Sequence, residues 1–377
     1  MLLINSFNKI FRDIKGDFLD NINAKHLFFI ISAITIVSLK TYPTIFIRNA
    51  GRDSWIVVII ASLIILFSFI FMLKTSLKTN TFDFYNIYTS SFGKILGTIL
   101  HFFFVFSLFL TLIECAGIES SSMHANILLD TPTWYIAIFI VFTAIYPVKK
   151  GHLSVLAVTI IGIILMILAG INLAILTSSY KKYKYLFPIL ENGLNKNHFL
   201  ALLKVLGLYA HIVIFFPYLE LVHNKNKIFK ISIWSFIFVI QMQIIAIVGI
   251  LSTFEINHAK NLIYPKLLQT QLISYWRFIE SGEFFVMLQT VGGWYVKYVL
   301  VLNILNKSFE KIFTGNKYLI FIVSILTYIF TSFLTQKLLR FFDFLNFYSL
   351  ISFINFLLIP FIAFIILYFK NNKSISS

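Results

Sequence analysis

A lysine lies about halfway along the first long apolar segment, where charged side chains are rare. The segment reads LFFIISAITIVSLKTYPTIFI from Leu27 to Ile47, and Lys40 stands beside Thr41 and shortly before Pro43. Because a charge at the centre of a bilayer is costly, Lys40 should face an internal cavity or a partner. It could fill a cation site, carry a proton or pair with a substrate carboxylate. The alternative is a helix that ends earlier, with the Lys40 ammonium reaching the membrane surface.

A polar stripe runs along the third apolar segment. Ser107, Thr111 and Glu114 are spaced at i, i+4 and i+7, so they share one face of a helix. Such a stripe suits either a cavity wall or a seam of hydrogen bonds between helices, and the seam is the commoner arrangement. Glu119, further along, is expected in the loop that follows this segment.

The sixth apolar segment carries three more groups that could titrate. Lys204 and His211 are seven residues apart and share a face, and Glu220 follows the FFP stretch. With two groups from the other segments they form a predicted charge network of Lys40, Glu114, Lys204, His211 and Glu220, which could relay protons. The equal alternative is a structural ion pair that fixes the register of the helices.

Two of the apolar segments are interrupted in mid-span. The first carries Lys40, Thr41 and Pro43, and the sixth, from Phe199 to Leu221, carries Pro217. Helices broken at membrane depth leave backbone groups unpaired, which is tolerated only where they line a cavity within the protein. Paired interruptions in distant segments therefore favour a transporter-like binding site near the bilayer midplane. The alternative is that both prolines merely kink packed helices.

The composition is that of an integral membrane protein. Of the 377 residues, 59% are hydrophobic and 12% are charged, and the mean hydropathy is +0.88. Soluble domains contain about 45–50% apolar and about 25% charged residues. A span needs about 20 mostly apolar residues. The segments that we predict as spans are 27–47, 55–74, 95–116, 133–147, 153–177, 199–221, 229–252, 284–306, 318–336 and 345–369.

These spans predict one transmembrane domain over residues 27–369, preceded by a cytoplasmic segment (1–26) and followed by a short cytoplasmic tail (370–377). Lys and Arg are more numerous in the connections on the amino-terminal side, which places both termini in the cytoplasm, although Lys181, Lys182 and Lys184 oppose this orientation. The net charge of +16 does not indicate a nucleic-acid partner, because the basic residues are scattered between the spans. The expected surroundings are a lipid bilayer.

The sequence gives no indication of an enzyme, a metal site or a cofactor. It contains no GxxxxGK[ST], HExxH, CxxC or GxSxG motif, each of which would have supplied a specific chemistry. The histidines form no i, i+4 pair suited to a metal, and Cys115 is the only cysteine. We therefore do not expect an enzyme.

Two further features lie in the second half of the chain, between residues 253 and 298. The stretch QTVGGWYVKY places Gly292 and Gly293 before Trp294 and Tyr295. The glycines allow close helix approach, Trp294 is expected in an aromatic belt at the membrane interface, and Tyr295 could line a pocket. The long, half-apolar connection over residues 253–283 should pack on the bundle as a lid or an interfacial helix.

Five stretches resemble the spore germination permease family, which comprises the B subunits of endospore germinant receptors. They are AGRDSW (50–55), PTWYIAIFIVFTAIYPVKKG (132–151), LFPILENGL (186–194), FFPYLEL (215–221) and the run from YPKLLQTQ to GGWYVK (264–297). The family looks like a branch of the amino acid–polyamine–organocation transporters. Such a resemblance implies an all-α membrane fold of two inverted five-helix repeats, about 27–177 and 199–369, with helices 1 and 6 broken.

The resemblance also implies a role and partners. It implies residence in the spore inner membrane with the termini on the core side, assembly with a germinant receptor A subunit and a lipoprotein C subunit, and recognition of a small germinant, commonly an amino acid. The ligand-binding residues that we predict are Ser38, Leu39, Lys40, Thr41, Phe106, Phe215, Phe216 and Tyr295.

One departure from the family pattern bears on the ligand. The first span of the family carries a glycine-containing break before its proline, whereas the stretch here, IVSLKTYP (36–43), has no glycine. Ser38 cannot freely take the conformations of glycine. Either the ligand differs from an amino acid, or Lys40 replaces part of the site.

Three functions remain open on the sequence. The first is a receptor subunit that senses a germinant through a midplane pocket. The second is a proton-coupled amino-acid permease that uses Lys40, Glu114, His211 and Glu220 as a relay. The third is a scaffold, or an ion or water conduit, with the ligand read by a partner subunit.

Overall fold

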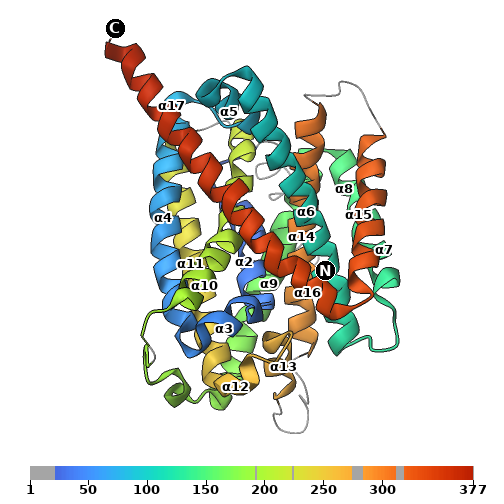
Figure 1. Cartoon of the computed structure of the whole chain (residues 1–377). Coiled ribbons are helices and arrows are strands. Elements are labelled where there is room, and N and C mark those ends of the chain that lie inside the picture. Colours follow the sequence, from blue (N-terminus) through green and yellow to red (C-terminus); the bar gives the residue numbers. More distant parts are fainter. Residues whose placement is uncertain (1–21, 192, 223–224, 274–282, 311–317, 377) are drawn as a thin grey trace, which may run out of the picture.

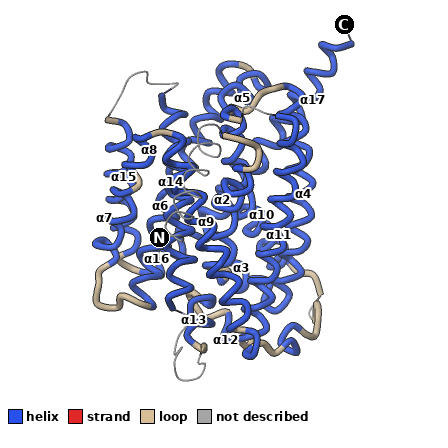
Figure 2. Tube along the Cα trace, turned by 180° about the vertical axis from the view of Figure 1, so that it is seen from behind, coloured by secondary structure: helices blue, strands red, loops and turns tan. Residues whose placement is uncertain are grey.

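The computed structural model describes residues 22–191, 193–222, 225–273, 283–310 and 318–376, and this part of the chain contains helices and no strands (Figures 1 and 2). Seven helical stretches are long and apolar enough to cross a membrane, and α2 and α15 are shorter apolar helices. With the pair α7 and α8 they make up the ten predicted spans. An all-α membrane fold of about ten helices is therefore confirmed.

The first half of the bundle comprises spans one to five. Its helices are α2 (His26–Thr41), α3 (Thr44–Ala50), α4 (Ser54–Thr79), the short α5 (Phe84–Phe92), α6 (Lys94–Asn126), α7 (Thr133–Thr143), α8 (Ile145–Lys150) and α9 (His152–Leu176). The 33-residue α6 runs ten residues beyond the predicted end of the third span. Glu119 consequently lies within a helix and is 3% exposed, which corrects its expected place in a loop.

The second half comprises spans six to ten and two short helices between spans seven and eight. Its elements are α10 (Lys196–Tyr209), the tight helix η5 (Ala210–Leu221), α11 (Ile228–Thr253), α12 (Ile256–Ala259), α13 (Pro265–Gln271), α14 (Glu283–Glu310), α15 (Leu319–Thr335), α16 (Leu338–Ser352), the π-helical η7 (Phe353–Leu358) and α17 (Ile359–Ser376). In Figure 1, α3, α12 and α13 lie at the end of the bundle opposite to α5 and the carboxyl terminus.

Helices of the first half pack against helices of the second half. Helix α2, from span one, packs against α11, from span seven, while α10, from span six, packs against α4, from span two. Spans three and eight contact each other through α6 and α14, and spans four and nine through α7 and α15.

The interruption in span one is a true break. Helix α2 ends at Thr41, and Tyr42 leaves the helical region with φ −128° and ψ 55° before Pro43 starts the next element. A proline disfavours the helical conformation in the residue before it and supplies no N–H of its own. The proline at position 43 therefore separates α2 from α3.

The interruption in span six takes a different form. Helix α10 gives way at Ala210 to a 12-residue 3₁₀ stretch, η5, that contains Pro217. Runs of this tighter helix rarely exceed a few residues. Both predicted interruptions are present, but only the first separates two helices.

The described part of the connection over residues 253–283 packs on the bundle, as its apolar composition predicts. The Tyr264 hydroxyl lies 2.6 Å from the Ser121 hydroxyl on α6. The Thr44 hydroxyl donates to the carbonyl of Leu262 at 2.6 Å. Helix α13 contacts α2, α11 and α14. It therefore closes one end of the space between these helices, while residues 274–282 lie outside the described part.

Candidate functional site: a buried ion pair and an adjacent cavity

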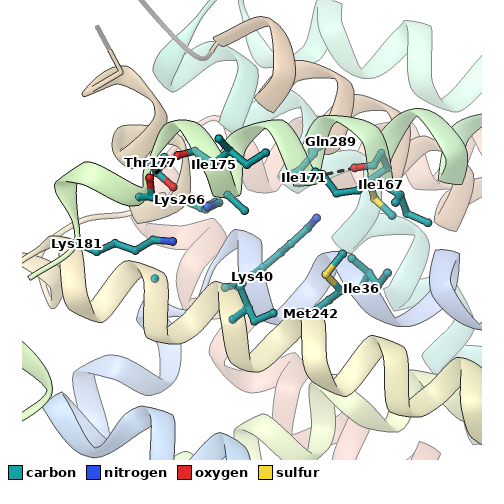
Figure 3. Close-up of a pocket in the computed structure, with 17 residues that line it drawn as sticks. Ile36, Lys40, Ile167, Ile171, Ile175, Thr177, Lys181, Met242, Lys266 and Gln289 are labelled. Carbon is teal, nitrogen blue, oxygen red and sulfur yellow. Dashed lines mark hydrogen bonds between the residues drawn. The ribbon is translucent and has the colours of Figure 1, made fainter. Parts of the chain in front are cut away.

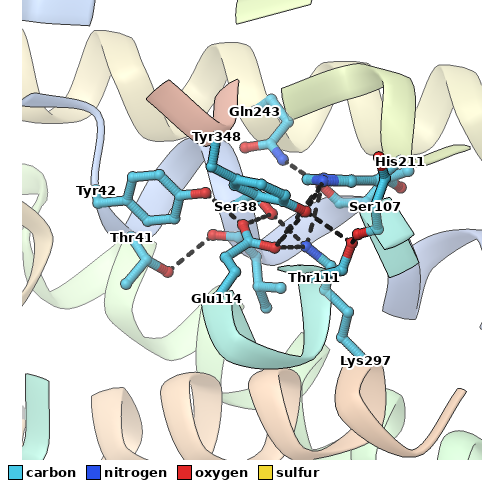
Figure 4. Close-up of polar contacts among 12 residues, drawn as sticks. Ser38, Thr41, Tyr42, Ser107, Thr111, Glu114, His211, Gln243, Lys297 and Tyr348 are labelled. Atoms are coloured by element: carbon cyan, nitrogen blue, oxygen red, sulfur yellow. Dashed lines mark hydrogen bonds and ion pairs between the residues drawn. The ribbon is translucent and has the colours of Figure 1, made fainter. Parts of the chain in front are cut away.

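A carboxylate on α6 is the centre of a polar cluster in the middle of the bundle (Figure 4). The Lys297 ammonium donates to Glu114 Oε2 at 2.8 Å and to Ser38 Oγ at 2.7 Å. Ser38 in turn donates to Glu114 Oε1 at 3.0 Å, and the Tyr42 hydroxyl donates to the same oxygen. The side chains of Glu114 and Lys297 are both 0% exposed. We call these residues, with His211 and Tyr348, the buried cluster.

A histidine and a tyrosine extend the buried cluster. The Lys297 ammonium lies 3.4 Å from His211 Nδ1, and His211 Nε2 lies 2.7 Å from the Tyr348 hydroxyl. An ammonium can only donate, so the fitting state is a neutral imidazole with its proton on Nε2. The Tyr348 hydroxyl then has Thr111 at 2.7 Å and Glu114 Oε2 at 3.4 Å as further partners. The hydrogen bonds therefore form a continuous path around the carboxylate.

Five separate elements supply the buried cluster. Ser38 lies in the last turn of α2 and Tyr42 in the break after it, while Lys297 comes from α14, His211 from η5 and Tyr348 from α16. The predicted stripe on α6 forms the wall that they meet. Its first residue, Ser107, accepts from Asn355 at 2.7 Å. The stripe is therefore a seam of hydrogen bonds between helices.

A cavity of about 550 Å³ lies on the other side of α2 (Figure 3). It is enclosed by α2, α9, α11, α13 and α14 and by the residues that follow α9. Three ammonium groups line it: Lys40 from α2, Lys181 from the segment after α9, and Lys266 from α13. Most of the remaining lining is aliphatic. The cavity is therefore apolar with a cationic end.

The lysines of the cavity have few partners. Lys266 donates to the Gln269 amide oxygen at 2.9 Å. Among the described residues, the side-chain nitrogens of Lys40 and Lys181 make no hydrogen bond or ion pair. Burial, together with the nearby Lys181 charge, lowers the pKa of Lys266 to about 8. Burial also lowers the pKa of Lys181. The cavity therefore holds positive charge that the protein does not balance.

Helix α2 presents one face to the cavity and another to the buried cluster. Ile36 and Lys40 line the cavity, whereas Ser38 and Tyr42 bond to the cluster. Residues two apart on a helix point in nearly opposite directions, so this alternation is what the helix geometry dictates. Gln243 of α11 supports the same turn by donating to the carbonyl of Ile36 at 2.8 Å. One turn of α2 thus joins the two sites.

The four predicted ligand-binding residues on α2 lie in four different surroundings. Ser38 belongs to the buried cluster and Lys40 to the cavity. Leu39 is a fully buried core residue, and Thr41 donates to the carbonyl of Val37 at 2.8 Å. These four remain together because they share one turn of α2.

The predicted aromatic residues are not brought to that turn. Phe215 and Phe216 are fully buried in an aromatic core, with their rings 5.6 and 6.1 Å from that of Phe69. Phe106 is 44% exposed on α6, and Tyr295 is half-buried on α14. None of these four aromatic residues lines the cavity.

The predicted charge network is divided by the fold. Only Glu114 and His211 approach each other, with Nε2 and Oε2 3.9 Å apart. Lys204 instead donates to the carbonyl of Ile45 at 3.0 Å and to two asparagines, which ties α10 to α3 and α16. Lys40 lies in the cavity, and Glu220 is exposed. The five residues therefore do not form one cluster in this structure.

Sequence reasoning missed three members of the buried cluster: Lys297, Tyr42 and Tyr348. A signal for Lys297 was available, because it is an ionisable group inside an apolar segment, as Lys40 is. Trp294 also needs a correction. It is 0% exposed rather than part of an interface belt, because its ring packs 6.1 Å from that of Tyr42 and lies 5.0 Å from the Lys297 ammonium.

Comparison with known proteins identifies one matching family. A family model described as "Spore germination protein" matches residues 21–340. The match covers most of the chain, including α2, α6, η5 and α14. A search of curated proteins gives no significant match. Within the described residues, no group of three or more His, Cys, Asp and Glu side chains could hold a metal ion.

Proposed function

Because the chain belongs to the spore germination permease family, we propose that it is the membrane subunit of a spore germinant receptor. In this proposal it lies in the spore inner membrane with both termini on the core side. It assembles with an A subunit and a lipoprotein C subunit, and it senses a small germinant. In this proposal the transporter-like fold binds the germinant, and the partner subunits transmit the signal that triggers germination.

The observation that carries this proposal is the place of α2 between the cavity and the buried cluster. A germinant in the cavity would attract Lys40 and displace the last turn of α2. Ser38 and Tyr42 are on that turn or directly after it, so their bonds to Glu114 would change with it. The break at Tyr42 and Pro43 allows this turn to shift without carrying α3 along.

The proposal predicts a specific loss of germination when Lys40 loses its charge. Spores that carry Lys40→Met should lose germination or change their preference within a panel of amino acids and salts, at normal levels of the protein on a blot. Lys182→Met is the matched control, because Lys182 is exposed and is not part of the cavity lining. Normal germination of the Lys40→Met spores would move ligand sensing to a partner and leave this chain as a scaffold or conduit.

A second candidate, the proton-coupled permease, is favoured by the buried cluster itself. Lys297, Glu114, His211 and Tyr348 form a connected path of titratable groups inside the membrane domain. Such paths are typical of proton relays in transporters. Uptake of amino acid into proteoliposomes in response to a pH gradient would support the permease. Ligand binding without uptake would favour the receptor.

A further inference from the structure

We infer that the cavity beside Lys40 takes an organic anion with an apolar body, and that it makes no use of an ammonium group on the ligand. The inference rests on the proposed function, because it names the class of ligand that the proposed sensing cavity would accept. It departs from the amino acid that the family resemblance implies. The ligand group that it requires is a carboxylate or a phosphate.

The charges of the cavity support an anion. Lys40, Lys181 and Lys266 approach it from three different segments. The described lining residues include no aspartate or glutamate. An anion would therefore gain favourable charge interactions with the lysines of this cavity. The ammonium of an α-amino acid would be drawn to the same end by its own carboxylate, where it would meet like charges and no acidic partner.

The carboxylates elsewhere in this region are not available to a ligand ammonium. Glu114 already accepts from Ser38, Tyr42 and Lys297, and α2 stands between it and the cavity. Glu119 is buried on α6 and has one carboxylate oxygen without a partner, but it is not part of the cavity lining. A zwitterion would therefore leave its ammonium unpaired in this site.

The apolar part of the cavity indicates what the rest of the ligand should be. Ile171 and Ile175 of α9 and Ile245 of α11 line it and are 48%, 63% and 46% exposed. The cavity therefore opens between α9 and α11 on a hydrophobic surface of the bundle. Its volume of about 550 Å³ lies within the range of small-molecule sites. A branched or linear aliphatic body fits these walls.

The electrostatics of Lys266 agree with this ligand class. Its pKa is lowered to about 8 because the side chain is buried and because Lys181 is close. An anion between these lysines would offset both effects, since it would replace lost solvation and screen the repulsion. An amine would add to the repulsion.

Three ligands with nearly the same apolar body test the inference. The purified full-length chain in detergent is titrated with L-leucine, with 4-methylpentanoate, which lacks the ammonium, and with 3-methylbutylamine, which lacks the carboxylate. We expect 4-methylpentanoate to bind about tenfold more tightly than leucine, a difference of about 1.4 kcal/mol, and the amine not to bind. Equal or tighter binding of leucine would overturn the inference.

Variants show whether the cavity is the site that binds. Lys181→Met should weaken the binding of 4-methylpentanoate by about tenfold, whereas Lys182→Met should leave it unchanged. The two lysines are adjacent, but only Lys181 lines the cavity. Lys181 lies outside the helices, so its substitution spares the bundle. Binding that survives Lys181→Met and also Lys266→Met would contradict the assignment.

Such an anion could be a lipid headgroup or a soluble organic acid. Competition experiments in nanodiscs distinguish these two sources. If phosphatidylglycerol, but not phosphatidylcholine, displaces 4-methylpentanoate, the natural occupant is an anionic lipid. If neither lipid competes, it is a soluble organic acid. Both results support the inference. Failure of the proposed function would look different, because the Lys40→Met spores would then germinate normally even though the purified chain still bound the anion.

Discussion

Hydrogen bonds from several helices surround the buried ion pair. The Glu114 carboxylate accepts hydrogen bonds from Ser38, Tyr42 and Lys297. The Lys297 ammonium also contacts His211. A buried charge that loses its partner costs about 3–5 kcal/mol, whereas replacing both charges is often nearly neutral. The pair can therefore set the position of α2 without being essential for folding.

This argument predicts that the stability of the ion-pair variants is not additive. Lys297→Met should lower the free energy of unfolding by about 3–5 kcal/mol, because it leaves Glu114 buried and unpaired. The double variant Lys297→Met with Glu114→Gln should recover most of that loss. Thermal unfolding in detergent measures both. A double variant that is as unstable as the sum of the single variants would show that the two residues do not act as a pair.

The lowered pKa of Lys266 predicts a pH dependence of ligand binding. Lys40 from α2 and Lys181 from the segment after α9 face the cavity with Lys266, and Gln269 is its neutral hydrogen-bond partner. Lys266 is charged below about pH 8. Raising the pH through this value removes one positive charge from the cavity, so the affinity for an anion should fall.

The measurement is the binding of 4-methylpentanoate between about pH 6.5 and about pH 9.5. A single linked proton limits the fall to about tenfold per pH unit. In Lys266→Met the decline centred near pH 8 should be absent. An affinity that rises with pH would contradict the placement of the anion beside this lysine.

At the residue scale, the sequence identified polar and ionisable side chains in the spans but not which of them contact one another. Helical spacing placed Ser107, Thr111 and Glu114 on one face. The rarity of ionisable groups in membranes singled out Lys40, which lines the cavity, and His211, which lies in the buried cluster. Lys297, and not Lys40, forms the ion pair with Glu114. This choice depends on how α14 and α2 are rotated about their axes. Such contacts between distant spans leave no periodic pattern in a single sequence.

At the scale of elements, the close approach of α14 to α2 depends on one glycine. A methyl group on Gly293 would lie 2.4 Å from Val37 Cγ1 and 2.9 Å from Met166 Sδ. The close contact allows Lys297, one turn further along α14, to reach Ser38. The sequence indicated close packing at the two glycines but not which neighbour each one meets.

Two adjacent glycines offer a matched test of this packing. Gly293→Ala should destabilise the bundle by about 1–3 kcal/mol, because it overpacks the interface between α14 and its neighbours. Gly292→Ala should have little effect, because a methyl group there would meet only the Gly162 carbonyl, at 4.0 Å. Unfolding temperatures of the two purified variants give the comparison. Equal destabilisation by both would show that α14 lies differently against α2.

Element boundaries were predicted less well than element number. Apolar length found the ten spans, and prolines marked the interruptions, because both follow from single segments. The 33-residue length of α6 was missed, since its last turns are polar and resemble a loop. Those turns stay helical because they are buried within the described bundle.

At the scale of the whole molecule, we propose that α2 couples the cavity to the buried ion pair. The break after α2, the contacts between the two halves and the family membership are the observations behind this proposal. The apolar composition of the 253–283 connection predicted that it packs on the bundle, but not that it brings Lys266 beside Lys40 and Lys181.

The most direct test of the central claim is germination of spores that carry Ser38→Ala. Ser38 is the link from α2 to both Glu114 and Lys297, and it does not line the cavity. Ser32→Ala is the control, because the Ser32 hydroxyl on the same helix is buried and makes no hydrogen bond to any described residue. We predict that Ser38→Ala spores lose most of their germinant response at a normal protein level, while Ser32→Ala spores respond normally. A normal response from the Ser38→Ala spores would contradict the claim that α2 couples the cavity to the ion pair.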